Sequence, residues 1–223
     1  MAKRAVIIVA GGTGTRMNLN TAKQFLPLAE KPVLLHTFEA FRLFDPNLQF
    51  ILVLYKSLHG EWKKIQKDYG FDLEHTVVEG GKERFHSVKN GIAALADDVE
   101  LVAIHDAVRP FVSADTIARC FESAAKSGAA IPAVPVVDTI RRLSGETSNT
   151  LPRKELVAIQ TPQCFRTALL KEAYETEYRD IFTDDASVIE NTGHSIEIVE
   201  GNRRNIKITT REDLLIANSF LKG

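Results

Sequence analysis

Apolar residues gather in four short runs along the 223-residue chain, and each run is apolar at successive positions instead of alternate ones. The runs are Ala5–Val9, Phe50–Leu54, Leu101–Ile104 and Ala129–Val137. Short continuous runs that are rich in β-branched residues are typical of strands covered on both faces. This feature excludes a sheet with one face open to solvent, and it favours helical layers on both sides.

The segments between the runs carry apolar residues three or four positions apart, which is the spacing of one helical face. Examples are Leu34, Phe38 and Phe41; Val88, Ile92 and Leu95; and Ile117, Phe121 and Ala124. Alternating strands and helices imply parallel strands joined by right-handed crossovers. We therefore expect an α/β fold with one doubly wound, mainly parallel sheet, formed by residues 1–223 as a single domain.

Residues 136–156 interrupt this alternation. Two short strands, Val136–Ile140 and Thr150–Leu151, flank a polar turn over Ser144–Asn149, which predicts a projecting β-hairpin arm. An isolated two-stranded hairpin is marginally stable in water, so the arm would need another surface, such as a second subunit. We therefore expect a homodimer formed through the arm. The alternative is an excursion that folds back on its own sheet.

The chain after the arm returns to helices and strands. The pattern predicts a helix over Thr167–Tyr178, a second helix from Asp184, a strand over Ser195–Glu200 and a last helix from Thr210. Thr210 and Asp213 have the spacing of a capping box, in which the two side chains bond to each other's backbone N–H groups. This spacing supports the start of the last helix at Thr210.

Charge and cysteine content exclude several classes of protein. The chain has 28 Lys and Arg against 29 Asp and Glu, so no overall positive field attracts nucleic acid or an anionic membrane. Cys120 and Cys164 lack the spacing of a zinc site or a redox pair, which fits a reducing compartment. The first apolar run is too short for a signal peptide or a membrane span. We expect a cytoplasmic protein.

A glycine-rich segment, Ala10–Met17, follows the first apolar run. Ligands of open α/β sheets bind beyond the carboxyl ends of the strands, where glycines let backbone N–H groups approach phosphate oxygens. Arg16 and Lys23 would supply two cations that bracket a polyphosphate. A Walker Gly-Lys-Ser/Thr is missing, and Met17 stands where a dinucleotide fingerprint needs Gly or Ala. The alternative is a glycine turn that only connects strand to helix.

A carboxylate follows the third apolar run. Asp106 would project from the end of this strand into the same crevice, and one carboxylate beside phosphates suits Mg²⁺. The alternative is that Asp106 pairs with Arg109 to shape a turn. We interpret the neighbouring His105 as structural, because no second ligand stands at a metal-binding spacing from it.

Two weaker signals complete the candidate site. The alternation in Asn205–Thr209 predicts a strand with Lys207 on the face opposite Ile206 and Ile208, where it could border the crevice. Taken alone, the pattern favours an ordinary half-exposed strand lysine. Glu79–Arg84 forms a turn into a helix, and Ser87 beyond it could bond to a ligand or to its own backbone. No nucleophile elbow, Cys–His pair or H-E-x-x-H motif is present. These features favour phosphoryl-group transfer by positioning and charge neutralisation.

Six blocks of sequence, in order over nearly the whole chain, resemble the methylerythritol phosphate cytidylyltransferases, a family of sugar-phosphate nucleotidyltransferases. The blocks are Ala10–Met17 with Lys23-Gln24, His105–Pro110, Pro135–Thr139, Gln160–Gln163, Thr183–Ser187 and Asn205–Thr209. The resemblance implies a Rossmann-like fold and a homodimer interlocked by the arm. It also implies transfer of CMP from CTP to 2-C-methyl-D-erythritol 4-phosphate, with release of pyrophosphate, in non-mevalonate isoprenoid biosynthesis.

The resemblance also implies the roles of individual residues. Arg16, Lys23 and Lys207 would hold the triphosphate and the reacting α-phosphate, and Asp106 would bind Mg²⁺ or substrate hydroxyls. The nucleotide would contact Ala10, Gly11, Gly12, Gly14, Gly81 and Ser87, and the polyol phosphate would contact Asp106, Arg109, Thr139, Arg153 and Thr183. Thr139 and Arg153, on the arm, would reach the substrate of a neighbouring subunit.

Some features keep other functions open. Lys82 and Arg204 occupy positions that are acidic in many relatives, so a side-chain contact to cytosine and a second metal carboxylate are not expected there. A closely similar family acts on ribitol 5-phosphate and shares several of the blocks. A catalytically silent nucleotide-binding module would use the same crevice, whereas Met17 weakens the case for a nicotinamide oxidoreductase.

Overall fold

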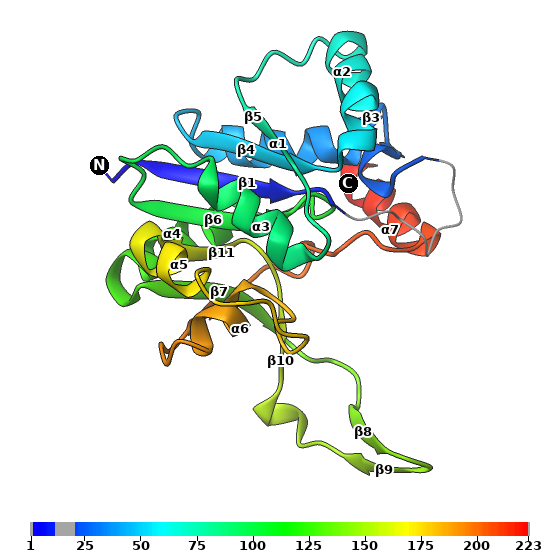
Figure 1. The fold of residues 1–223 in the computed structure, drawn as a ribbon. Helices are drawn as coiled ribbons and strands as arrows, with labels where there is room; N and C mark the ends of the chain where they lie inside the picture. The colour runs from blue at the N-terminus through cyan, green and yellow to red at the C-terminus, as the bar shows by residue number, and fades with distance from the viewer. Residues whose placement is uncertain (1, 12–20, 223) are drawn as a thin grey trace.

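The computed structural model describes residues 2–11 and 21–222, and its centre is an eight-stranded sheet (Figure 1). In chain order the strands are β1 (Arg4–Val9), β2 (Pro27–Leu28), β3 (Lys31–Pro32), β4 (Gln49–Leu54), β5 (Thr76–Glu79), β6 (Leu101–Asp106), β7 (Ala129–Pro135), β8 (Arg141–Ser144), β9 (Thr147–Thr150), β10 (Val157–Ile159), β11 (Gln163–Arg166) and β12 (Glu197–Glu200). The pairs β2–β3 and β8–β9 form separate ribbons outside the main sheet.

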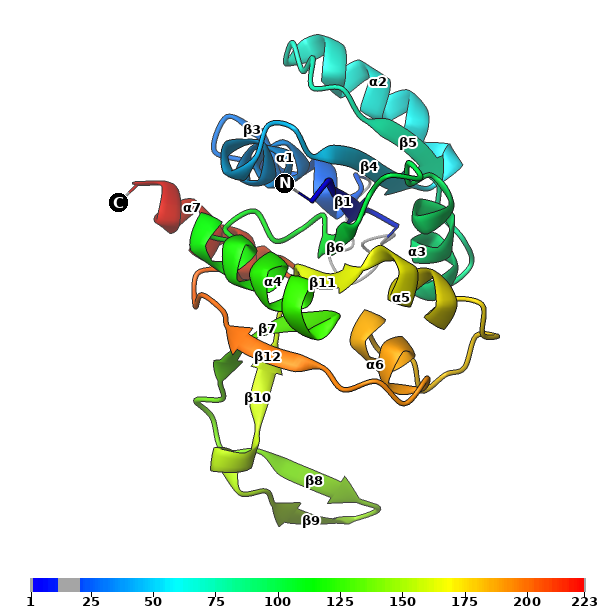
Figure 2. The same cartoon turned by 90° about the vertical axis from the view of Figure 1, so that its left-hand side faces the viewer.

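Helices cover both faces of this sheet. They are α1 (Val33–Phe44), α2 (His59–Asp68), α3 (Arg84–Ala93), α4 (Ala114–Ser127), α5 (Thr167–Ala173), α6 (Asp185–Glu190) and α7 (Arg211–Lys222), with short 3-10 turns at Lys23–Phe25, Lys56–Leu58 and Arg153–Glu155. Figure 2 shows α1 and α4 on one side of the sheet and α3, α5 and α6 on the other. The predicted doubly wound α/β fold is confirmed.

Parallel pairing aligns the strand ends that carry the candidate site. β1 lies between β4 and β6, and Val9 at its end pairs with Val53 of β4 and with Asp106 of β6. β5 extends this parallel group beside β4. β10 and β11 run antiparallel to β7, and β12 is parallel to it. The sheet is therefore mainly parallel, and the carboxyl ends of three strands meet at one level.

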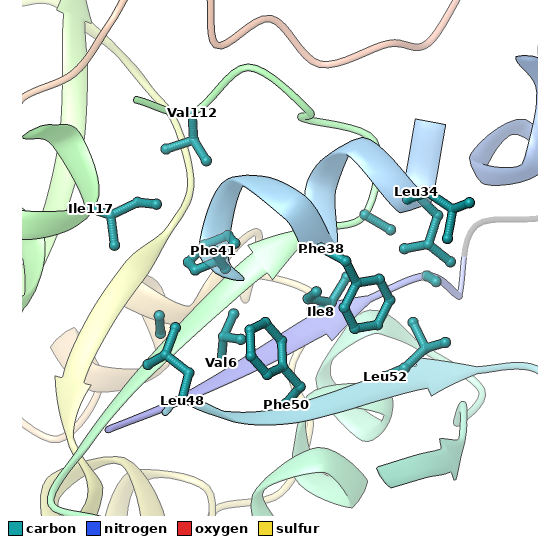
Figure 3. Close-up of a cluster of buried hydrophobic side chains, with 14 of the residues drawn as sticks. Val6, Ile8, Leu34, Phe38, Phe41, Leu48, Phe50, Leu52, Val112 and Ile117 are labelled. Atoms are coloured by element: carbon teal, nitrogen blue, oxygen red, sulfur yellow. The ribbon is translucent and has the colours of Figure 1, made fainter. Parts of the chain in front are cut away.

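Alternate side chains of β1 enter two different cores. Val6 and Ile8 pack with Phe38 and Phe41 of α1 (Figure 3), whereas Ile7 packs on the opposite face with α3 and α5. All of these side chains are fully buried, and full burial of one such side chain stabilises the fold by about 1.5–3 kcal/mol. Two-sided burial explains why the first run is apolar at every position.

The arm projects from the end of β7, and its strands β8 and β9 pair with each other in a separate two-stranded sheet (Figure 1). Its strands are β8 and β9, so the prediction of a strand over Val136–Ile140 is wrong, and the turn is shorter than expected. The turn consists of Gly145 and Glu146, and Gly145 has a φ of 58°, which glycine adopts without strain. This tight turn lets pairing continue from Ser144 to Thr147 through residues whose polarity had suggested a loop.

Three further expectations need correction. The helix expected over Thr167–Tyr178 ends at Ala173, and the strand expected from Ser195 begins at Glu197. Asn205–Thr209 is not a strand. The backbone carbonyl of Asn205 accepts hydrogen bonds from side chains instead of from a neighbouring strand. The last helix begins as predicted, because Thr210 and Asp213 exchange capping hydrogen bonds.

None of the helices in residues 2–11 and 21–222 combines the length and the apolar character that a membrane span requires.

Candidate active site

A pocket opens where the carboxyl ends of β1, β4 and β6 meet. Residues from six separate parts of the chain line it, including Ala10, Gly11, Lys23, Ser87, Asp106 and Lys207. The structure thus brings together candidates that lie almost 200 positions apart in the sequence. Gly12, Gly14 and Arg16 lie outside the described residues.

Asp106 is the last residue of β6, and three cations surround its carboxylate. Lys207 Nζ lies 3.0 Å and Arg109 Nε 3.1 Å from Oδ2, and Arg84 Nε lies 4.0 Å from Oδ1. Burial alone would raise the pKa of this carboxyl, but the charges of Lys207, Arg84 and Arg109 outweigh burial and hold the pKa well below its usual range. Asp106 is therefore ionised at neutral pH and faces a concentration of positive charge.

Arg109 pairs with Asp106 in the turn after β6. Its Nε donates to Asp106, as the turn interpretation expects, while Asp106 still lines the pocket. Its Nη1 donates to the backbone carbonyl of Asn205 at 2.8 Å. Asn205 is fully buried and stands two residues before Lys207. Arg109 therefore connects the turn after β6 with the segment that carries Lys207.

His105, the residue before Asp106, fixes the backbone around Asp106 through hydrogen bonds. Burial lowers the pKa of His105 to about 4, so the ring is neutral. Its Nε2 donates to the backbone carbonyl of Arg109, and its Nδ1 accepts from the hydroxyl of Thr161. The same hydroxyl accepts the N–H of Asp106 at 3.1 Å. This chain of hydrogen bonds requires the neutral ring and orients Asp106 from behind.

Arg84, at the start of α3, is held by a second buried carboxylate. Its Nη1 and Nη2 donate to the two oxygens of Asp185 at 2.8 and 2.6 Å. Asp185 is fully buried and also accepts a hydrogen bond from the hydroxyl of Tyr174. A bidentate pair of this kind restrains the guanidinium in one orientation. The third cation beside Asp106 is thus held from the opposite side by α6.

Ser87 lines the pocket and is bonded to Gly81, which precedes α3 and does not itself line the pocket. The N–H of Gly81 donates to Ser87 Oγ at 3.0 Å, and a Cβ on Gly81 would lie 2.3 Å from His86 Cβ. Only glycine fits at this position without displacement of the start of α3. On the β1 side, Gln24 is buried and donates to the carbonyl of Ala10 at 2.8 Å, which ties the end of β1 to the turn that carries Lys23.

Comparison with known proteins assigns the chain to a family. The family model described as IspD, 2-C-methyl-D-erythritol 4-phosphate cytidylyltransferase, matches residues 4–223. The chain belongs to this cytidylyltransferase family. A protein of that name from Bacteroides fragilis is 50% identical over 98% of this chain and 99% of its own length. One from Phocaeicola vulgatus is 52% identical over 98% of this chain and 99% of its own length.

Solved structures of the cytidylyltransferase family share the fold. A 4-diphosphocytidyl-2C-methyl-D-erythritol synthase from Anaerococcus prevotii has a TM-score of 0.85 and 30% identity, over 100% of this chain and 97% of the other. A 2-C-methyl-D-erythritol 4-phosphate cytidylyltransferase from Thermus thermophilus has a TM-score of 0.81 and 32% identity, over the full length of both chains. The mixed sheet and its helical layers are thus those of cytidylyltransferases.

The arm of this cytidylyltransferase family member carries candidates that do not line the pocket of their own chain. Thr139 and Arg153 are exposed. Arg153 Nη1 donates a hydrogen bond to the backbone carbonyl of Val137, near the base of the arm. Thr183 is also exposed and directly precedes Asp184, the residue that caps α6. The structure therefore groups Asp106, Lys207 and Lys23 in the pocket. The candidates Thr139, Arg153 and Thr183 lie outside it.

Sequence patterns missed several residues of the cytidylyltransferase pocket. Arg84 appeared only as part of a turn, since its partner Asp185 lies 101 positions away and no spacing signals such a pair. Thr161 and Asn205, which do not line the pocket, belong to blocks that carry the family resemblance, but their hydrogen bonds to Asp106 and Arg109 could not be deduced from the order of residues. Tyr55, which also lines the pocket, had no signal.

Proposed function

We propose that the chain transfers CMP from CTP to 2-C-methyl-D-erythritol 4-phosphate, giving 4-diphosphocytidyl-2-C-methyl-D-erythritol and pyrophosphate in isoprenoid biosynthesis. The observation that carries the proposal is the contact between Asp106 and Lys207 inside the pocket, 3.0 Å apart, with two arginines beside the same carboxylate. Family membership supplies the identity of the substrates. The pocket supplies the charge that a triphosphate and an incoming phosphate require.

The reaction needs no side-chain nucleophile. An oxygen of the polyol phosphate attacks the α-phosphorus of CTP, a new P–O bond forms, and the bond to the β-phosphate oxygen breaks as pyrophosphate leaves. A phosphate monoester loses its second proton near pH 6, so the attacking group is mostly dianionic at neutral pH. Lys207 and Lys23, with Arg16 of the glycine-rich segment, would stabilise the charge that develops around the α-phosphorus.

Asp106 fits a magnesium site that is completed by the substrate. Across the described ranges, no three His, Cys, Asp or Glu side chains converge on a position for a metal ion. Mg²⁺ commonly takes one or two carboxylates and fills its shell with water and phosphate oxygens, so the ionised Asp106 suits it. When bound there with CTP, the ion would neutralise triphosphate charge. Asp106 would then exchange part of its contact with the three cations for contact with the metal.

The nucleotide and the polyol phosphate would use different sets of residues. Ala10, Gly11, Gly81 and Ser87 present backbone groups and one hydroxyl, which suit the polar edge of cytosine; Gly12 and Gly14 belong to the same predicted set. Arg109 and Thr183 would face the polyol phosphate. Close packing against His86 leaves no room for a side chain at Gly81, whose N–H donates to Ser87 Oγ.

The arm would complete the site in a homodimer. Thr139 and Arg153 would reach the polyol phosphate of a second subunit. Exposed apolar side chains on and beside the arm support this association: Val137 is 62% and Leu143 80% exposed in the single chain. Deletion of residues 139–153 is expected to give monomers in light scattering, and a persistent dimer would contradict the role of the arm.

Pyrophosphate release tests the reaction directly. Purified protein is offered CTP and Mg²⁺ with methylerythritol 4-phosphate or ribitol 5-phosphate in parallel, and ATP, GTP and UTP replace CTP as controls. Release with CTP and the methylerythritol substrate alone is expected. Release with ribitol 5-phosphate alone would change the substrate, and CTP binding without any release would favour a silent nucleotide-binding module.

A further inference from the structure

Tyr55 lines the pocket without a role in the proposed chemistry. It directly follows the last residue of β4, and its ring borders the pocket together with Gly11 and Ser87. β4 lies between β1 and β5 in the sheet. Tyr55 therefore stands in the middle of three parallel strand ends, beside the backbone that follows each neighbouring strand.

Backbone hydrogen bonds tie both neighbours to the end of β4. The N–H of Ala10, after β1, donates to the carbonyl of Val53 at 2.8 Å. The N–H of Gly80, after β5, donates to the carbonyl of Leu54 at 3.0 Å. The two glycine-containing segments are thus held on opposite sides of Tyr55, and their separation is set by the sheet.

The ring of Tyr55 spans the gap between these segments. A Cβ on Gly80 would lie 3.2 Å from ring atom Cδ1, and a Cβ on Gly11 would lie 3.8 Å from Cζ. Ser87 Oγ lies 3.5 and 3.4 Å from the same two Cβ positions. One edge of the ring therefore rests on Gly80, and its hydroxyl-bearing end reaches Gly11 beside the Ser87 hydroxyl.

We propose that Tyr55 is a specificity-determining residue that limits the size of the nucleobase. Its ring closes the pocket between Gly11 and Gly80, so that a pyrimidine fits against Ser87 and the larger purine meets the ring. The inference rests on the proposed function, which places the base beside Gly11, Gly81 and Ser87. Rejection by shape differs from rejection by hydrogen bonding: the ring acts on size, whereas backbone groups and Ser87 distinguish cytosine from uracil.

This difference defines the test. Specificity constants kcat/KM for CTP, UTP and ATP are measured by pyrophosphate release in wild type, Tyr55→Ala, Tyr55→Phe and the control Tyr69→Ala, which removes an exposed tyrosine at the end of α2. In Tyr55→Ala the ratio of CTP to ATP is expected to fall by about tenfold or more, the scale of discrimination by apolar contacts. The ratio of CTP to UTP is expected to stay within about twofold. Tyr55→Phe and Tyr69→Ala are expected to match wild type.

Two results would overturn the proposal: an unchanged ratio of CTP to ATP in Tyr55→Ala, or an equal fall in Tyr55→Phe, which keeps the ring. Thermal unfolding of each variant checks the fold, and Tyr55→Leu, which shortens the side chain but keeps apolar bulk, replaces Tyr55→Ala if that variant does not fold. Calorimetric binding of CTP and ATP to the same proteins separates the two proposals. If the wild type shows no turnover, the proposed function is contradicted. The ratio of the affinities for CTP and ATP, compared between wild type and Tyr55→Ala, still tests the role of the ring.

Discussion

The arm and the pocket that contains Asp106 differ in how far apart in the sequence their hydrogen-bond partners lie. In the pocket the partners come from distant parts of the chain: Arg84 bonds to Asp185, 101 positions away, and Arg109 to Asn205, 96 positions away. In the arm they are local, because Arg141 donates to side chains and backbone 7 to 9 positions away. The pocket therefore depends on the whole fold, whereas the hairpin turn and pairing depend on a short segment.

The pocket and the arm also differ in how deeply their residues are buried. Asp106 is 8% exposed and His105 fully buried, so charge and hydrogen bonds act there in low-dielectric surroundings. The strands β8 and β9 are almost entirely exposed, and Leu143 is 80% exposed. Two paired strands without a covered face are marginal in water. The comparison teaches that the pocket is stabilised by contacts within one chain, while β8 and β9 are left uncovered by the part of the chain that the structure describes.

The largest expected effect is in the pocket. Lys207→Ala removes a cation 3.0 Å from Asp106, and loss of one preorganised charge at a transition state lowers turnover by about 100- to 1,000-fold. Pyrophosphate release measures the loss, and Lys63→Ala on the exposed face of α2 is the control. Normal turnover of Lys207→Ala would show that the pocket charge does not act on the reaction.

The next effect concerns the neutral state of His105. Its pKa is about 4 in the folded chain, against 6.5 for the free side chain. The unfolded chain therefore binds a proton first as the pH falls, and stability present above about pH 6.5 is lost progressively down to about pH 4. Between about pH 7 and pH 5 this loss amounts to about 2 kcal/mol.

Urea unfolding at several pH values measures this contribution. We expect His105→Asn to be less stable than wild type at pH 7 but to show a flatter pH profile, because the titrating group is absent. His194→Asn, at an exposed position, is expected to keep the wild-type profile. Parallel profiles for wild type and His105→Asn would contradict a buried neutral ring.

A smaller effect is expected on the arm. Arg153→Ala is predicted to weaken binding of the polyol phosphate by about tenfold, as for the loss of one charge-assisted hydrogen bond, and to leave CTP binding unchanged. Calorimetry with each substrate measures the two affinities. Lys154→Ala, a neighbouring exposed cation, is the control. Equal weakening of both substrates, or of neither, would count against an arm that reaches a second subunit.

The smallest effect should follow the loss of an exposed arm side chain. In dilute, monomeric protein, Leu143→Ala is expected to change the free energy of unfolding by less than about 0.5 kcal/mol, because its side chain packs against little in its own chain. Denaturant titration over a range of protein concentrations provides the measurement. A larger loss in the monomer would show that the arm packs on its own sheet. A loss that appears only at dimer-forming concentrations would agree with the comparison.

Much of the fold could be predicted because its signals are local. Continuous apolar runs marked β1, β4, β6 and β7, because two-sided burial excludes polar residues from such strands. The arm strands were misplaced for the opposite reason. Apart from Leu143, residues 141–150 carry no large apolar side chain, and nearly all of them are exposed, so no burial pattern marks them. Their pairing depends on the tight turn at Gly145.

The candidate site divides in the same way. Asp106 was predicted because it directly follows an apolar run that ends at the edge of the sheet, which is a local property. Lys23 was predicted because it follows Arg16 by seven residues in a polar stretch. Lys207 was predicted on a strand that does not exist, yet it reaches Asp106, because Arg109 and Gln160 hold the carbonyl of Asn205. That arrangement required side chains from three distant segments.

The sequence by itself determined the α/β class and the alternation of the main buried strands with helices, since periodicity and composition express burial directly, and its motifs determined the family resemblance. Only the tertiary structure decided which charges meet. The pairing of Arg84 with Asp185 and the place of Tyr55 between Gly11 and Gly80 depend on which strands are neighbours in the sheet. Contacts between distant segments leave no spacing in the sequence, because their geometry arises only when the sheet has assembled.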